Sequence, residues 1–468
     1  MKKGEQKVIR LTVTPAAEPI PAFRHRLVAR DIDLQPGNAA PFYYRALLEI
    51  PPLVKRMRDA DDPDRASKGC MHRWRQLHEI PLETVRKAGF RLDWLIDQQL
   101  NTATSRRQCD WQFGIEDLQG FKVYNFVLPE IQQMRELCGL VALHTRLAIA
   151  DGRLDDALDA IRMNYRIAGD AATTRFLVCC LVGTAVARIV NETLIELIAA
   201  RGSPNLYWAL TELPNPLIDL GPAFRFESEI RARVFPFIQE SETTQRSYEE
   251  WNRLFRMSWR EIYKGMLEGR CRKVTPLQTE LTALATALAG YPHAKRQLVA
   301  EGMDAGRVDE MPVGQVLAAY SERNCERLRD EWKKLFYMPF WEYQAREPVT
   351  GRELNEAADP FSRHAQREVL PMASALLFGF AQYRVPQVRL QREIAALRLI
   401  EALRMYAAEH GGRLPTSLDE VTRVPLPMNP ATGQPFDYTL EDGVAVLEMP
   451  RLDRHESERE RFEIVIAQ

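Results

Sequence analysis

Carboxylate and tryptophan side chains occur together twice within residues 93–111. Asp93 and Asp97 are four residues apart, so on a helix both carboxylates lie on one face, with Trp94 beside them. Asp110 directly precedes Trp111. Glycan hydrolases use two carboxylates as acid and as base or nucleophile, and aromatic rings stack on sugars. The three aspartates are therefore candidate catalytic residues, and the two tryptophans are candidate binding residues.

A second interpretation of these residues is structural. Tryptophans are usually buried in a core, and aspartates usually lie on the surface or cap helices. The adjacent pair Tyr207 and Trp208 presents the same choice between burial among helices and a platform for a ligand. We favour the structural interpretation, which makes a glycan-acting hydrolase the alternative function. The residues that would bind a ligand in either function are Trp94, Trp111, Tyr207 and Trp208.

Motifs of four common enzyme classes are absent, because the chain has no HExxH, GxxxxGK[ST], GxGxxG or GxSxG. Cys70, His72 and His78 are the closest approach to a metal cluster, but their spacing does not place all three on one helical face. The sequence therefore predicts no metal site and no cofactor. Hydrolases that assemble carboxylates from distant helices leave no contiguous motif, and they remain open.

Composition predicts a globular protein without affinity for nucleic acid. Hydrophobic residues make up 46% of the 468, which is ample for a core. The 63 basic and 64 acidic residues give a net charge of -1, so no overall field attracts polyanions. The 7 cysteines are an odd number without CxxC spacing, which excludes a complete disulfide framework. Mixed charge runs at residues 322–334 and 451–461 are typical of solvated helix faces.

The N-terminal residues and the most apolar segment bear on location. Residues 1–8 are polar and show no export signal. Residues 176–190 are apolar but shorter than the roughly 20 residues that span a bilayer, and they include Arg188. We therefore expect a buried core helix there and no transmembrane segment, and the location of the protein stays unknown.

Hydrophobic periodicity predicts three consecutive parts. Residues 1–40 form an extended arm with one strand at 8–14 that could pair with a C-terminal strand. Residues 41–360 show helical periodicity throughout, including a helical hairpin that turns at Asp151-Gly152. A helix is predicted to begin at the cap Ser203-Pro204. A charged loop at residues 347–360, with Pro348 and Gly351, marks the boundary before a module at residues 361–468.

The C-terminal module combines a helix with a β-hairpin. Ile394, Leu397, Ile400, Leu403 and Tyr406 recur at intervals of three residues, which predicts a helix with one face toward a core. Strands are predicted at residues 436–440 and 444–449. The Asp-Gly pair between these two apolar runs is the strongest short hairpin signal.

Three resemblances follow from these residues. The hairpin with Gly152, Ala157 and Ile161 resembles a tetratricopeptide (TPR) repeat. The stretches "HGGRLPTSLDEV" and "NPATGQPFDYTLEDG" resemble the soluble module of type II secretion pseudopilins. The stretches "GNAAPFYYRALLE", "CDWQF" and "GSPNLYWALTELPNPLIDL" resemble an uncharacterised family of predicted exported planctomycete proteins, which implies export.

Some pseudopilins bind calcium near the hairpin, where this chain has Asp437, Glu441 and Asp442. About seven oxygen ligands would be needed, so we predict no calcium site.

The expected fold is mainly α, with irregular stacked helical hairpins of TPR-like type and a small pseudopilin-like α+β module at the C-terminus. Stacked hairpins form extended concave surfaces, and pseudopilins belong to multi-subunit machinery. We therefore expect a non-catalytic macromolecule-binding or scaffold protein of the bacterial cell envelope with a protein partner, and leave open whether it is an enzyme.

Overall fold

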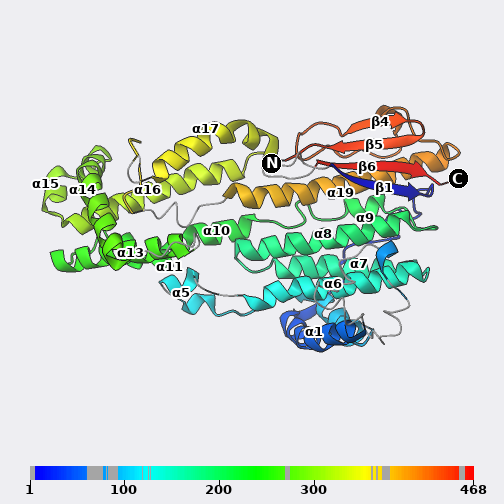
Figure 1. The fold of residues 1–468 in the computed structure, drawn as a ribbon, viewed down its shortest axis with the longest axis horizontal. Helices are drawn as coiled ribbons and strands as arrows, with labels where there is room; N and C mark the ends of the chain where they lie inside the picture. The colour runs from blue at the N-terminus through cyan, green and yellow to red at the C-terminus, as the bar shows by residue number, and fades with distance from the viewer. Residues whose placement is uncertain are drawn as a thin grey trace. The chain divides into compact units, whose positions relative to one another are not determined.

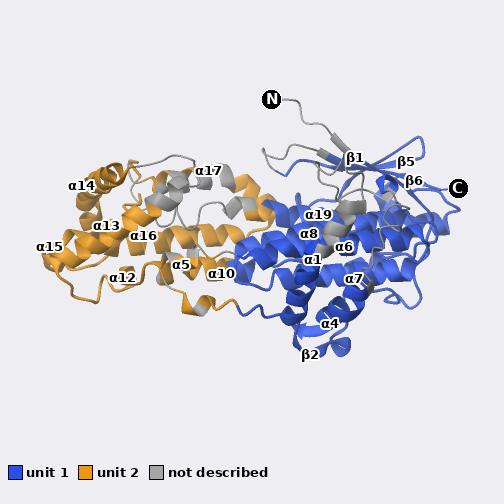
Figure 2. Ribbon diagram, turned by 60° about the horizontal axis from the view of Figure 1, so that its bottom comes forward, with its two compact units in different colours: residues 1–112, 128–223, 385–468 blue, residues 113–127, 224–384 orange. Residues whose placement is uncertain are grey.

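The computed structural model describes residues 6–60, 77–80, 82, 93–118, 120–124, 126, 128–268, 275–359, 362–364, 367–370, 380–452 and 459–467. They are mainly α-helical, with a small C-terminal sheet. Two compact units are present (Figure 2): unit 1 comprises residues 1–112, 128–223 and 385–468, and unit 2 comprises residues 113–127 and 224–384. The units alternate along the chain, whereas the sequence suggests the consecutive parts 1–40, 41–360 and 361–468.

The helical part of unit 1 is built on three mutually packed helices (Figure 1): α6 (Pro129–Ala150), α7 (Leu154–Ala171) and α8 (Leu177–Ala199). The predicted hairpin is confirmed, because α6 and α7 are joined at Asp151-Gly152, where Gly152 has φ +73°. Such a positive φ favours glycine, so this turn is encoded locally.

Helices α7 and α8 approach each other closely at Gly183. A Cβ atom at Gly183 would lie 2.7 Å from the carbonyl oxygen of Ala168, whereas one at Gly169 on α7 would meet nothing within 4 Å. We expect Gly183→Ala to lower the free energy of unfolding by about 1–3 kcal/mol, because the added methyl group forces the backbones of α7 and α8 apart. Gly169→Ala is the matched control, and it should raise stability by up to about 1 kcal/mol. Urea titrations of both variants test this, and equal effects would contradict it.

Helix α8 is long and apolar enough by composition to cross a membrane, but 67% of its most apolar window is buried inside the protein. It packs against α6 and α7, and both Cys179 and Cys180 are buried. The prediction of a core helix at residues 176–190 is therefore confirmed within this structure.

The sheet of unit 1 has four strands in the order β1-β6-β5-β4: β1 (Gln6–Val13), β4 (Asp437–Glu441), β5 (Val444–Met449) and β6 (Arg459–Ile466). The hairpin of β4 and β5 is confirmed, with antiparallel pairing across Asp442-Gly443. β1 pairs in parallel with β6, with Gln6 opposite Arg459 and Val13 opposite Ile466. The expected pairing between the arm and a C-terminal strand is therefore confirmed.

The expectation that the charge run at residues 451–461 forms a solvated helix face is wrong at its C-terminal end. Residues from Arg459 onward belong to β6, which lies inside the sheet. Phe462 and Ile464 are buried there, while Arg461 pairs with Glu448 of β5 and Arg10 of β1 pairs with Glu463. Neighbouring strands supply opposite charges, so a charged sequence can form a central strand.

Helix α19 (Phe380–Glu409) is buried on several faces rather than on one. Leu397, Ile400 and Leu403 are buried as predicted, but so are Ala402 and Met405 on the opposite side of the helix. Its contacts explain this: Glu393 binds Arg188 of α8, and Arg392 donates to the carbonyl of Pro450 beside the sheet. The helix therefore lies between α8 and the sheet.

The predicted helix start at Ser203-Pro204 is wrong. The short helix α9 (Tyr207–Thr211) begins after Leu206, and Asn205 accepts a hydrogen bond from the Tyr207 amide. The carbonyls of residues 203 and 204 instead accept hydrogen bonds from the Arg404 guanidinium. A distant arginine therefore satisfies the carbonyls of this turn.

Two small strands, the longer helix α1 and several short helices complete the part of unit 1 that holds the site described below. They are η1 (Asp31–Asp33), β2 (Gln35–Asn38), α1 (Ala40–Ala60), α3 (Asp93–Leu95), the π-helix η5 (Ile96–Leu100), α4 (Asn101–Thr104) and β3 (Arg106–Gln108). β2 pairs in parallel with β3.

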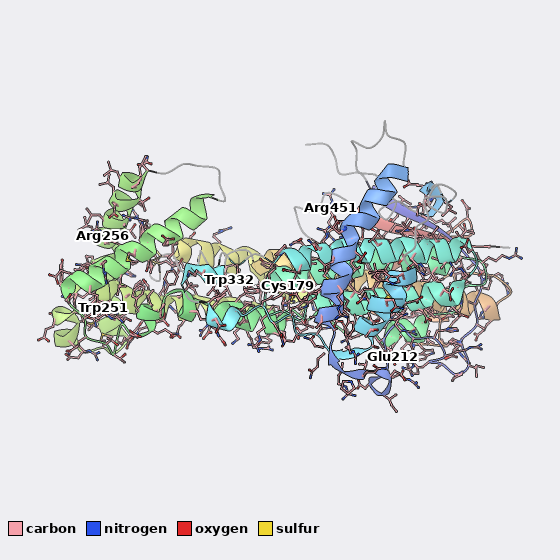
Figure 3. The ribbon with its side chains drawn as sticks, turned by 90° about the horizontal axis from the view of Figure 1, so that it is seen from below. Cys179, Glu212, Trp251, Arg256, Trp332 and Arg451 are labelled. Atoms are coloured by element: carbon pink, nitrogen blue, oxygen red, sulfur yellow. The ribbon has the colours of Figure 1, made fainter. Side chains whose placement is uncertain are left out.

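Unit 2 is helical in its described residues, with α16 packed against α13 and α14. Its elements are α5 (Phe121–Tyr124), α10 (Gly221–Glu229, which begins in unit 1), α11 (Arg231–Val234), α12 (Pro236–Gln239), α13 (Tyr248–Glu268), α14 (Pro276–Ala300), α15 (Ala305–Glu310), α16 (Val313–Phe336) and α17 (Phe340–Ala358). Figure 3 labels Trp251 of α13, which is fully buried.

The loop predicted at residues 347–360 is wrong. Helix α17 continues through Pro348 and Gly351 to Ala358. Local propensity explains the difference, because most residues around this proline and glycine are good helix formers, including Glu353, Leu354 and Ala357. Two helix breakers do not end a helix in such a context.

Candidate functional site

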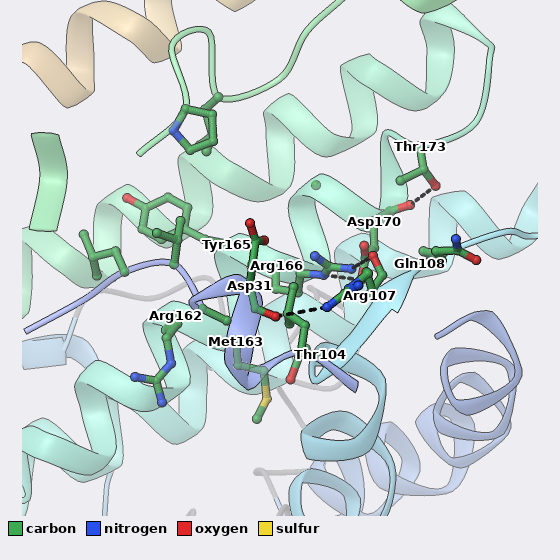
Figure 4. Close-up of a pocket in the computed structure, with 18 of the residues that line it drawn as sticks. Asp31, Thr104, Arg107, Gln108, Arg162, Met163, Tyr165, Arg166, Asp170 and Thr173 are labelled. Atoms are coloured by element: carbon green, nitrogen blue, oxygen red, sulfur yellow. Dashed lines mark hydrogen bonds and ion pairs between the residues drawn. The ribbon is translucent and has the colours of Figure 1, made fainter. Parts of the chain in front are cut away.

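A cavity of about 720 Å³ in unit 1 is the best candidate for a functional site (Figure 4). Its walls come from four segments that are distant in the sequence: residues 27–34, residues 101–110, one face of α7 from Asp159 onward with Thr173 just after the helix, and Pro214 with Leu217. A volume of this size is typical of ligand pockets. The lining is mainly polar around the α7 wall, where charges of both signs meet.

Asp170 lies at the buried wall of this cavity and joins three elements. Its side chain is almost fully buried, and Oδ2 accepts hydrogen bonds from the Tyr43 hydroxyl of α1 at 2.7 Å and from Arg166 Nε at 3.0 Å. Its backbone carbonyl accepts from the Trp111 indole N–H at 3.0 Å. Burial raises the pKa of Asp170 to about 6, although Arg166 and Tyr43 lower it.

Arg166 extends this polar network to the strand β3. Its Nη2 atom donates to the backbone carbonyl of Arg106 at 2.8 Å. The neighbouring residue Asp110 is fixed by Asn38, whose amide side chain donates to the Asp110 carbonyl at 2.7 Å and accepts from the Asp110 amide at 2.8 Å. The polar wall is therefore held by side chains that are already paired, which makes it preorganised.

The rim of the cavity carries exposed charges with free hydrogen-bonding capacity. Arg107 and Asp31 are exposed, and the Arg107 guanidinium donates a hydrogen bond to the Asp31 backbone carbonyl at 3.3 Å. Arg162 and Asp159 form an exposed ion pair at 2.7 Å, which contributes little to stability. Solvent-facing donors and acceptors are therefore both present at the opening.

Cys109 also lines the cavity, but it is a poor nucleophile. Burial, followed by the Asp170 charge, raises the pKa of its thiol far above the ordinary value. Because the thiolate is the reactive form, we assign this cysteine to the wall of the cavity.

The structure separates the predicted catalytic aspartates. Asp110 lines the cavity and is exposed, while Asp97 is exposed on η5 and is not part of the lining. Asp97 accepts a weak hydrogen bond from Asn101 at 3.5 Å. Asp93 begins α3, and its side chain lies outside the described part of the chain. A facing pair built from these aspartates is therefore not present in the described part of the chain.

The four candidate binding residues do not form one site either. Trp111 is buried and stacks on Tyr43 with centroids 5.7 Å apart, and Tyr207 is fully buried. Trp208 is half-buried and donates to Glu18 of the arm at 2.7 Å. Trp94 is 51% exposed and does not line the cavity. Three of the four rings are thus engaged in packing or hydrogen bonds within unit 1.

Sequence reasoning missed Asp170, Tyr43 and Arg166. The one available signal was an acidic residue on the apolar face of α7, between Ala168 and Ala171. Hydrophobic periodicity cannot identify the partners of Asp170, because Tyr43 is 127 residues away in the chain.

A second cavity of about 780 Å³ in unit 1 is lined by residues of α8, α19 and the sheet. Its charges are largely neutralised in pairs: Arg146 binds Glu196 and Arg188 binds Glu393, each at 2.8 Å. Burial, followed by repulsion from Glu460, raises the pKa of Glu393. Such a network of ion pairs fits the role of joining α8 to α19.

No group of three or more histidine, cysteine, aspartate or glutamate side chains suited to a metal ion occurs within the described ranges. Cys70 and His72 lie outside them, and His78 is exposed beside Glu79.

Comparison with known proteins adds no relative. No family model matches the sequence, and neither a curated protein nor a solved structure matches it.

Proposed function

We propose that this chain is a binding protein that holds a segment of a protein partner in the Asp170 cavity. The observation that carries the proposal is the charge balance of the lining, which includes three arginines (Arg107, Arg162 and Arg166) and four aspartates (Asp31, Asp110, Asp159 and Asp170). A lining that carries charges of both signs attracts neither polyanions nor polycations as a class. It suits a ligand that itself carries donors, acceptors and both charges.

Sugars are a weaker fit to this cavity. Stacking on an aromatic face supplies much of the affinity of sugar sites. Among the lining residues the single aromatic is Tyr165, which is buried and donates its hydroxyl to Asn191 at 2.7 Å. A polypeptide needs no such face, because its amides and side chains can pair with the exposed donors and acceptors of the rim.

The finer resemblances enter as parts of this proposal. We propose that α6 and α7 act as a TPR-like hairpin and that α19 with the β4–β5 hairpin is a pseudopilin-like module, in an exported protein of the bacterial cell envelope. Their support is the turn at Gly152 and the succession of a long helix, a 3-10 turn at Leu418–Glu420 and a hairpin. Both types of module bind other proteins.

Site-specific photo-crosslinking tests the proposal. A photo-reactive residue at Gln108, which is exposed and lines the cavity, should crosslink one protein reproducibly in the source cells. The same residue at Gln98, which is exposed but outside the lining, is the matched control and should not. Arg107→Glu should reduce the crosslink at Gln108 by about tenfold, since it reverses a rim charge. Equal crosslinking from Gln98 and Gln108, or none, would refute the proposal.

A glycan-acting hydrolase is the second candidate. The observation that favours it is Asp170, a carboxyl with a pKa of about 6 in a cavity that Asp110 also lines. In that mechanism Asp170 acts as the acid, and turnover of glycans falls at least a hundredfold in both Asp170→Asn and Asp110→Asn. Glycan turnover that survives both substitutions, or no turnover by the wild type, would reject it.

A further inference from the structure

Helix α14 of unit 2 has its apolar and polar faces reversed. From residue 277 to residue 294 the face toward the other helices carries small or polar residues, since Thr279, Ala283, Thr286, Gly290, His293 and Ala294 are buried, and a buried leucine, Leu298, occurs only in the last turns. The face toward solvent carries four leucines, with exposed fractions of 68% at Leu277, 57% at Leu281, 57% at Leu284 and 69% at Leu288. A helix on the surface of a globular protein normally shows the opposite arrangement.

Close packing on the inner face holds the helix in this orientation. A Cβ atom at Gly290 would lie 2.6 Å from a methyl group of Val369, so only glycine fits there. His293 Nε2 lies 3.1 Å from the Tyr320 hydroxyl of α16, and the two rings are in edge contact. Rotation of α14 to bury its leucines would break these contacts and place leucine where glycine is required. The outward leucines are therefore fixed by the packing of unit 2.

The spacing of the leucines is that of a helix–helix seam. Leu277, Leu281, Leu284 and Leu288 are separated by four, three and four residues, the a/d pattern of a heptad repeat. At about 1.5 Å per residue the seam is roughly 16 Å long. Four leucines that are each more than half exposed form an apolar patch on the order of 400 Å², a size that marks interaction sites on soluble proteins.

We propose that this leucine seam is a self-association surface, on which α14 of one copy packs against α14 of a second copy. A seam of leucines is self-complementary, since each side chain fits between those of an identical helix. One flank does not oppose this pairing, because Gln278, Thr282, Ala285 and Ala289, which lie together on one side of the seam, are uncharged. The other flank carries Glu280, the sole charged residue among positions 277–290, which is paired with Arg256 at 2.8 Å and with Arg260, both of α13.

Charge also favours a second copy over a lipid surface. Helices that lie on membranes usually carry lysine and arginine beside the apolar face. Residues 277–294 of α14 contain neither. Lys295 and Arg296 follow beyond the seam, and Lys295 is paired with Asp309 at 2.5 Å. Two seams with their flanks bury on the order of 1,000 Å² together, at the lower end for specific interfaces. Interfaces of this size are usually weak or transient, so we expect a reversible dimer.

Sedimentation equilibrium of the full chain across the micromolar range tests the proposal. The wild type should pass from the mass of one chain to that of two as concentration rises. Leu281→Glu with Leu284→Glu should weaken the dimer at least about tenfold, because it places charges in the seam. Both side chains are mostly exposed, so far-ultraviolet circular dichroism and the thermal midpoint should be unchanged.

Leu48→Glu is the matched control, since Leu48 is an exposed leucine (75%) on α1 of unit 1 and lies outside the seam. It should dimerise as the wild type does. A wild type that keeps the mass of one chain at every concentration would overturn the proposal. The proposal would also be overturned if the seam variant dimerised as strongly as the wild type. A monomeric wild type that co-sediments with anionic lipid vesicles, and loses this binding in the seam variant, would overturn it as well.

Discussion

Arg404→Met should destabilise the protein by about 3–5 kcal/mol at pH 8, the largest effect we expect from a single substitution. Arg404 and Glu401 are fully buried on α19 and form an ion pair at 2.9 Å. The same guanidinium donates to the carbonyls of Thr14 at 2.9 Å and Ser203 at 2.8 Å. Its removal therefore leaves a buried carboxylate and several carbonyls without their donor.

The accompanying pH dependence has a definite sign. Burial raises the pKa of Glu401, and the Arg404 charge opposes this rise. Without Arg404 the pKa of Glu401 rises further, so the carboxyl can take up a proton in the folded state. A raised folded-state pKa contributes stability that is lost as pH increases. The destabilisation by Arg404→Met should therefore be smaller at pH 5 than at pH 8.

Two variants control this prediction, and urea titration measures all of them. Arg413→Met makes the same chemical change at an exposed position and should alter stability by no more than about 0.5 kcal/mol. Glu401→Leu combined with Arg404→Met removes both charges and should be more stable than Arg404→Met alone. If the single and double variants were equally unstable, the unpaired charge would not be the cause.

Asp170→Asn should remove a fall in stability that the wild type shows between pH 4 and pH 8. Burial raises the pKa of Asp170 to about 6 from an ordinary value of 3.8. The folded state therefore holds a proton that the unfolded chain releases, and stability decreases as pH rises through this interval. At about 1.4 kcal/mol per unit of pH, this group accounts for a difference on the order of 3 kcal/mol.

The measurement is the free energy of unfolding of wild type and variant at pH 4 and pH 8. Asparagine is neutral at both pH values. The free energy of unfolding of the variant, relative to that of the wild type, should therefore increase by about 3 kcal/mol from pH 4 to pH 8. Asp159→Asn, at an exposed position on the same helix, controls for the loss of an aspartate. The prediction fails if Asp170→Asn and the wild type respond to pH alike.

Much of the candidate site was beyond sequence reasoning because its parts are far apart in the chain. Asp110 was identified as a chemical candidate, and it does line the cavity. Its neighbours there, Asp170 and Arg166, come from α7, and the buried hydroxyl beside them comes from Tyr43 of α1. The tryptophan next to Asp110 proved to be core, stacked on that tyrosine. Residue type indicates possible chemistry, but only the fold decides which groups meet.

The sequence by itself determined the features that local geometry encodes. The helical turn at Gly152, the hairpin at Asp442-Gly443 and the burial of α8 all follow from short patterns, and the structure has them. Tertiary structure alone decided three others: the charged strand β6 inside the sheet, the cavity around Asp170, and the outward face of α14.

The physical reason is the range of the interactions. Backbone propensity and apolar spacing act over a few residues, so they specify helices and turns. Strand β6 depends on β1, whose residues lie more than 450 positions earlier, and α14 is oriented by the contact of Gly290 with Val369. For α14 the local pattern even suggests the opposite face, since leucines normally point inward. Close packing on small residues overrode that preference.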